Sequence, residues 1–224
     1  MNAPLSGKSL ATARYNMVEQ QISPWNVNDR AVLNLMATLP REQFVPSEYA
    51  NYAYSDIEIP LSPSANMLFP KVEARLLQGV ALRKSDQILE IGSGSGYTAA
   101  LLGKLGGQVT SIEIDPELAD RARENLNKVG IDNVIVEQGD ASDGWESDTR
   151  FDVIAIGGSL PFVPDSFKNQ LKVGGRLFCV IGNRPVMDAV VIVRTHAKEW
   201  QEQFLFETLL TPLENRLSSP KFRF

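Results

Sequence analysis

The 224-residue chain has an ordinary globular composition, with 43% hydrophobic and 22% charged residues. This composition argues against intrinsic disorder, and no apolar run reaches the roughly 18 residues of a membrane-spanning helix. The net charge of −5 disfavours sequence-independent binding to nucleic acid. A single cysteine and a single histidine exclude a disulfide framework and a zinc site rich in Cys and His, so no metal is expected.

The first 84 residues are predicted to be mostly helical. Apolar residues recur at helical spacing over 11–22, 29–39 and 72–82. Residues 60–70 contain three prolines and two serines and are predicted to form an irregular loop. The N-terminus has no long apolar core, so we expect no secretory signal and a cytoplasmic protein.

From residue 85 onwards, short apolar runs alternate with helical segments. Strands are predicted at 87–91, 109–114, 134–137, 151–156 and 176–181, and helices at 97–105, 117–129 and 165–171. Such alternation is typical of βαβ units in a parallel sheet. Strands at 189–194 and 203–209 have no helix between them and predict an antiparallel edge. The expected fold is α/β: a doubly wound, mainly parallel sheet in residues 85–224, with residues 1–84 as a helical extension packed on it.

A glycine-rich turn follows the first predicted strand. Glu90 is followed by Gly92, Gly94 and Gly96, and glycines at alternate positions let a ligand approach the backbone closely. The next helix begins here and directs free N–H groups toward the same space. The spacing differs from the dinucleotide fingerprint and lacks the lysine of a P-loop. The turn therefore predicts a nucleotide-like ligand at the carboxyl end of the sheet.

Two acids at later strand ends fit the same ligand. Glu113 ends the second predicted strand, where a carboxylate can accept hydrogen bonds from ribose hydroxyls. Asp140 follows the third strand, where it can accept from an exocyclic amine of a base. Either acid alone is as well explained as a solvated loop carboxylate. Their order with the glycine turn, at successive strand ends, favours one shared site.

These motifs resemble the S-adenosylmethionine site of class I methyltransferases, which have a Rossmann-like fold. Further segments resemble one subfamily, the protein-L-isoaspartate O-methyltransferases; they are 40–46, 53–56, 139–145, 151–154, 170–177 and 210–213. The resemblance covers about residues 15–214. It implies S-adenosylmethionine as cofactor, bound by Glu90, Gly92, Ser93, Gly94, Gly96, Glu113, Ile114, Asp140 and Ala141.

The resemblance implies an O-methyltransferase that repairs proteins or peptides by methylating a carboxylate of damaged aspartyl residues. A carboxylate is already ionised at neutral pH and needs no general base, which agrees with the scarcity of histidine. The expected partner is a protein or peptide that carries isoaspartate, or a small carboxylate. Neither nucleic acid nor a membrane is an expected partner.

One departure from the family pattern concerns its substrate loop, Gly-x-x-Thr-Ile-Ser-x-Pro, whose serine helps to hold the substrate carboxyl. Aligned without gaps from Glu90, Pro70 matches the motif proline, Asn66 the threonine and Leu68 the serine. Leu68 cannot donate a hydrogen bond. The acceptor is expected beside residues 62–70 and 157–161.

Three interpretations of this departure remain open. Isoaspartyl methylation survives if another polar group holds the carboxyl; the candidates are Ser62, Ser64, Asn66 and Ser159, with Asp56 as a weaker candidate for the rim. Alternatively, the apolar run 67–69 admits a different, more apolar acceptor. In the third interpretation the chain is a cofactor-binding or adaptor module without catalysis.

Overall fold

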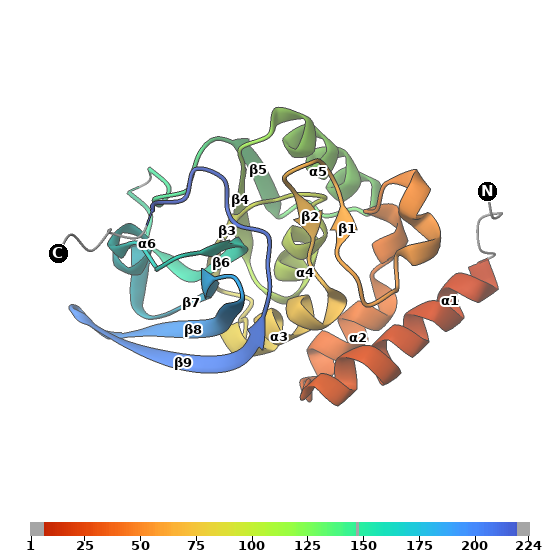
Figure 1. The fold of residues 1–224 in the computed structure, drawn as a ribbon, viewed down its shortest axis with the longest axis horizontal. Helices are drawn as coiled ribbons and strands as arrows, with labels where there is room; N and C mark the ends of the chain where they lie inside the picture. The colour runs from red at the N-terminus through yellow and green to blue at the C-terminus, as the bar shows by residue number, and fades with distance from the viewer. Residues whose placement is uncertain (1–6, 147, 219–224) are drawn as a thin grey trace.

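The computed structural model describes residues 7–146 and 148–218. A seven-stranded sheet with the order β5-β4-β3-β6-β7-β8-β9 forms its centre (Figure 1). Five strands run parallel: β3 (Gln87–Ile91), β4 (Gln108–Glu113), β5 (Val134–Gln138), β6 (Phe151–Leu160) and β7 (Leu171–Asn183). Strands β8 (Val186–His196) and β9 (Glu199–Thr208) add an antiparallel edge. The predicted fold class is therefore confirmed.

Helices cover both faces of the sheet because its central strands are apolar on both sides. Along β3 and β6, Ile88 and Val153 belong to one buried cluster, whereas their neighbours Leu89 and Ile154 belong to the other. The first cluster also contains residues of α3 (Pro70–Val80), α4 (Tyr97–Leu105) and α5 (Pro116–Lys128), and the second contains Phe167 of α6 (Asp165–Gln170). This alternation is the period-2 signature of a strand buried on both faces.

The N-terminal residues share the core of the sheet. Helix α1 (Gly7–Asn16) continues as a π-helix over Met17–Ile22 and a 3₁₀ turn over Ser23–Trp25, and α2 (Arg30–Thr38) follows (Figure 1). Two further 3₁₀ turns, Arg41–Gln43 and Ser47–Tyr52, lead to the next loop. The fully buried Met17 and Met36 lie in the same apolar cluster as Val153 and Phe178 of the sheet.

The structure differs from the sequence prediction in two places. The predicted irregular loop contains a small antiparallel hairpin of β1 (Ile59–Pro60) and β2 (Asn66–Met67), because Ile59 and Met67 are both buried and pair with each other. Strands β6, β7, β8 and β9 also extend beyond their predicted bounds, since backbone pairing continues past the apolar runs. Within the described residues, no helix is long and apolar enough to cross a membrane.

Candidate functional site

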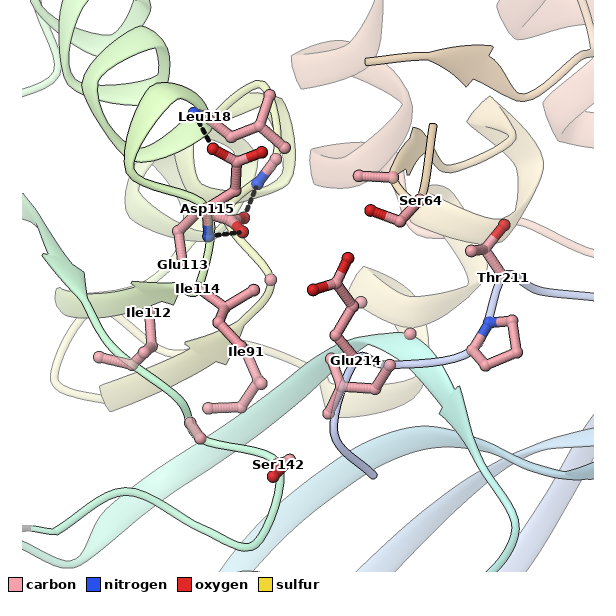
Figure 2. A pocket seen from close by; sticks show the side chains of 18 of the residues that line it. Ser64, Ile91, Ile112, Glu113, Ile114, Asp115, Leu118, Ser142, Thr211 and Glu214 are labelled. Carbon is pink, nitrogen blue, oxygen red and sulfur yellow. Dashed lines mark hydrogen bonds between the residues drawn. The ribbon is translucent and has the colours of Figure 1, made fainter. Parts of the chain in front are cut away.

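A cleft with an empty volume of about 750 Å³ lies at the carboxyl ends of the parallel strands, where the strand order reverses between β3 and β6. This is the usual ligand position in open α/β sheets. Figure 2 shows Glu113, Ile114 and Asp115 on one side, and Ser64, Thr211 and Glu214 on the other. Glu113 ends β4, and Ile114 and Asp115 follow it. Ser64 belongs to the β1–β2 hairpin, and Thr211 and Glu214 belong to residues 210–214, which we call the C-terminal strap.

The glycine turn forms the floor of this cleft. Gly92 and Gly94 line it with φ values of +89° and +52°, which favour glycine over residues with a Cβ. Gly96, at φ +84°, lines neither the cleft nor the neighbouring cavity described below. A Cβ on Gly96 would lie 3.2 Å from the carbonyl oxygen of Ala122, so this glycine allows α4 to begin close against α5.

Glu113 lies beside the turn with its carboxylate hydrogen-bonded to the backbone. Its Oε2 accepts from the Gly94 N–H at 2.7 Å, and its Oε1 accepts from the Asp115 N–H at 3.1 Å. Burial raises the pKa of Glu113, although these hydrogen bonds oppose the shift. The backbone of Ile114 also contributes a hydrogen bond. Since a carboxylate can accept about four hydrogen bonds, Glu113 keeps capacity for a hydroxyl of a ligand.

Asp140 also lines the cleft. Its carboxylate accepts hydrogen bonds from the Ser142 N–H at 2.9 Å and from Asn215 Nδ2 at 2.8 Å. Partial burial acts to raise the pKa of Asp140, but these bonds outweigh it and keep the pKa below its usual value. Ile114 and Ala141 add apolar wall to the same cleft.

A second, smaller cavity of about 390 Å³ adjoins the cleft. Glu90 and Ser93 line it, and Glu90 is 1% exposed. Ser111 donates to Glu90 Oε2, whereas Oε1 has no hydrogen-bond partner among residues 7–146 and 148–218. Burial raises the pKa of Glu90 to about 8. A buried carboxyl oxygen without a partner fits the amino group of an amino-acid moiety, so the second cavity suits the methionyl end of S-adenosylmethionine.

A buried ion pair supports the wall of this cavity. Arg41 is fully buried, pairs with Glu73, and stacks over the Tyr97 ring at 4.7 Å. Its other terminal nitrogen donates to the Leu68 carbonyl oxygen at 2.7 Å. Burial raises the pKa of Glu73 to about 7, while Arg41 and a hydrogen bond from Thr98 lower it. The pair thus fixes the backbone of the substrate loop at Leu68.

The candidates for the acceptor side have different surroundings. Ser64 and Asn66 line the open cleft. Leu68 is 5% exposed and contributes to the hydrophobic core and the second cavity, not to the cleft. Ser159 is buried, and its hydroxyl donates to the Leu210 carbonyl oxygen at 3.1 Å. Asp56 pairs with Lys71 and lines neither cavity.

The C-terminal strap lines the site, although no site role was predicted for it from the sequence. Its residues from Leu210 to Glu214 line the cleft, and Ser159 holds the strap by backbone hydrogen bonds to Thr211 and Leu213, each 2.9 Å long. A further bond joins Asn66 Nδ2 to Thr211 Oγ1 at 2.8 Å. The only sequence signal was the family-like segment 210–213, which by itself indicates no contact with the substrate loop.

Comparison with known proteins identifies the family. The model of the protein-L-isoaspartate(D-aspartate) O-methyltransferases matches residues 12–218. The chain belongs to this family. A protein-L-isoaspartate O-methyltransferase of Koribacter versatilis is 38% identical over 209 residues, covering 93% of both chains. One from Rhodopseudomonas palustris is 36% identical over 198 residues, 88% of this chain and 91% of the relative.

Solved structures agree with this assignment. One named protein-L-isoaspartate O-methyltransferase has a TM-score of 0.79 and 26% identity, covering 91% of this chain and 67% of that one. A Plasmodium falciparum structure in complex with S-adenosyl-L-homocysteine has a TM-score of 0.78, covering 91% and 99%, and at 20% identity it supports the fold alone. Family membership confirms the predicted methyltransferase class and the predicted cofactor, S-adenosylmethionine.

Proposed function

We propose that this chain methylates the free α-carboxylate of isoaspartyl residues in proteins or peptides and so initiates their repair. The observation that carries the proposal is the polar wall opposite Glu113. Ser64, Asn66 and Thr211 face the cleft, while Leu68 turns into the core. Met67 and Leu68 line the second cavity and not the cleft, so the run 67–69 does not form an apolar acceptor wall opposite Glu113.

The cofactor site follows from the same arrangement. We assign the ribose hydroxyls to Glu113 and the adenine amine to Asp140, with Ile114 and Ala141 against the base. The amino group belongs at the unpartnered oxygen of Glu90. Gly92, Ser93 and Gly94 line the space between these positions. When bound, S-adenosylmethionine supplies an electrophilic methyl group on a cationic sulfur.

The chain then needs only to position an ionised carboxylate and to exclude water. A carboxylate is ionised at neutral pH, so no group must remove a proton from it. His196, the only histidine in the sequence, lies exposed at the end of β8 and pairs with Glu199, away from the cleft. The proposed partner is a protein or peptide, and the proposed location is the cytoplasm.

The test is transfer of a labelled methyl group from S-adenosylmethionine to an isoaspartyl peptide, compared with the normal aspartyl peptide of the same sequence. Cofactor binding is measured on the same sample. We expect label on the isoaspartyl peptide alone. Cofactor binding with no label on either peptide would contradict the proposal and would favour another acceptor or a non-catalytic role.

A further inference from the structure

We propose that Asn66 and Thr211 together hold the acceptor carboxylate. They replace the hydroxyl of the family's substrate-loop serine, at whose position this chain has Leu68. This inference rests on the proposed function, since it concerns the same acceptor. It assigns the binding of the carboxylate to a pair of residues that come from opposite ends of the chain.

Asn66 lies where the cleft and the second cavity meet. Four residues line both the open cleft and the second cavity: Asn66, Gly92, Gly94 and Gly157. Three of them are glycines, so Asn66 brings the one polar side chain to this junction. A ligand with its nucleoside in the cleft and its amino acid in the cavity must cross here. An acceptor that meets the middle of such a ligand therefore meets Asn66.

Asn66 and Thr211 are hydrogen-bonded to each other and keep two further donors. Asn66 Nδ2 donates to Thr211 Oγ1 at 2.8 Å, so the Thr211 oxygen already accepts a bond. Within residues 7–146 and 148–218, the Thr211 hydroxyl donates to no acceptor, so its own proton is free to point elsewhere. The second N–H of the Asn66 amide is free in the same sense. A hydroxyl that accepts a bond also becomes a stronger donor. The pair thus presents two donors, which suits a carboxylate.

Backbone contacts and a buried side chain hold Asn66 and Thr211 in place. Asn66 lies on β2 and pairs with Pro60 of β1, and Arg41 fixes the loop two residues later through the Leu68 carbonyl. The Thr211 carbonyl accepts from the Ser159 N–H at 2.9 Å. Such support from backbone and buried residues is what a pre-organised binding site requires.

The other hydroxyls near the cleft are less well placed. Ser159 already donates to Leu210. Ser62 is hydrogen-bonded to the backbone of Ser64 and Ala65 and lies next to the Ser64 hydroxyl at 3.5 Å. Like Thr211, neither serine of the hairpin lines the second cavity, but only Thr211 is hydrogen-bonded to Asn66 at the junction.

Two substitutions test the pair through kinetics. Thr211→Val removes the hydroxyl at constant shape, and we expect KM for the isoaspartyl peptide to rise about tenfold with cofactor affinity unchanged. Thr211→Ser should keep activity close to wild type. Asn66→Asp replaces the donors by a negative charge, and kcat/KM should fall on the order of 100-fold. Thr38→Val and Asn34→Asp on the exposed side of α2 are the matched controls.

A binding measurement separates this inference from the proposed function. The protein is saturated with S-adenosylhomocysteine and titrated with the isoaspartyl peptide or with its α-carboxamide analogue. We expect wild type to prefer the carboxylate about tenfold or more, and Thr211→Val to lose most of that preference. Melting temperatures of all variants confirm that each has folded.

The outcomes are distinct. If wild type methylates the peptide and both variants behave like their controls, the inference is overturned and the proposed function stands. If wild type methylates nothing but prefers the carboxylate through these two residues, the proposed function fails and the inference stands. If wild type shows no preference for the carboxylate over the carboxamide, the inference is overturned.

Discussion

The two sides of the cleft are built in different ways. The cofactor side comes from consecutive strands, since Glu90, Glu113 and Asp140 lie at or just after the ends of β3, β4 and β5. The acceptor side joins segments separated by 145 positions, and the bond between Asn66 and Thr211 connects them. One side is therefore a property of the parallel sheet, whereas the other depends on how the hairpin and the C-terminal strap pack together.

The two sides also differ in their polar groups. The cofactor side carries Glu90, Glu113 and Asp140, which suit a ligand with cationic sulfur and ammonium groups. The acceptor side carries Glu214, but Asn66 at the junction and Thr211 bonded to it are uncharged donors, which suit an anion. Binding of the cofactor and binding of the methyl acceptor should therefore be separable by substitution, while the stability of the fold supports both.

The largest expected effect concerns the buried ion pair behind the acceptor loop. Arg41→Met leaves Glu73 buried without its partner and should lower the free energy of unfolding by about 3–5 kcal/mol in urea denaturation. The double variant Arg41→Met/Glu73→Leu should recover much of this loss. Lys128→Met is the control, because its pair with Glu124 is exposed and 3.7 Å long. A single Arg41 variant as stable as wild type would contradict the role assigned to the pair.

The next effect concerns the cofactor side alone. Glu113→Ala removes the acceptor for the Gly94 and Asp115 N–H groups and for the ribose, so S-adenosylmethionine should bind about 10- to 100-fold more weakly by calorimetry. KM for the peptide, measured at saturating cofactor, should stay near wild type. Asp132→Ala, an exposed loop acid, is the control. Unchanged affinity would show that the ribose lies elsewhere.

A smaller effect is expected at Asp140. Because this carboxylate is more exposed than Glu113, Asp140→Ala should weaken cofactor binding by about 1 kcal/mol, roughly fivefold. Asn215→Ala removes only the bond from the residue that follows the strap and should change cofactor affinity less. Equal losses in both variants would mean that Asp140 acts by holding Asn215, not by contacting the base.

The last prediction is the direction of a pH dependence of stability. Burial raises the pKa of Glu90 to about 8, above its value in the unfolded chain, near 4.5. The stabilising contribution of the protonated form is thus complete below about pH 4.5 and is lost as the pH rises through 8. Between pH 5 and 8, the free energy of unfolding of wild type should fall more steeply than that of Glu90→Gln. Parallel curves would contradict the raised pKa.

Most of the cofactor side could be predicted from the sequence. Glu113 and Asp140 were assigned from their places at strand ends, and both line the cleft. Whether they bind the cofactor is still a prediction. Gly96 shows the limit of this reasoning, because its role in packing α4 against α5 looks the same in sequence as a role in binding.

The acceptor side could not be predicted in this way. The run 67–69 allowed an apolar acceptor site in the cleft, but Met67 and Leu68 are buried in the core and line the second cavity instead. Nothing in the segment 210–213 indicated that Thr211 would contact Asn66.

The sequence by itself determined the fold class, the family and the order of the cofactor motifs. It could do so because strand and helix periodicities are local, and because parallel strands bring their carboxyl ends to one edge of the sheet. Only the tertiary structure decided which side of the substrate loop faces the cleft and which strap residue meets it. Those contacts depend on the packing of distant parts of the chain, including the buried pair of Arg41 and Glu73 that holds the loop.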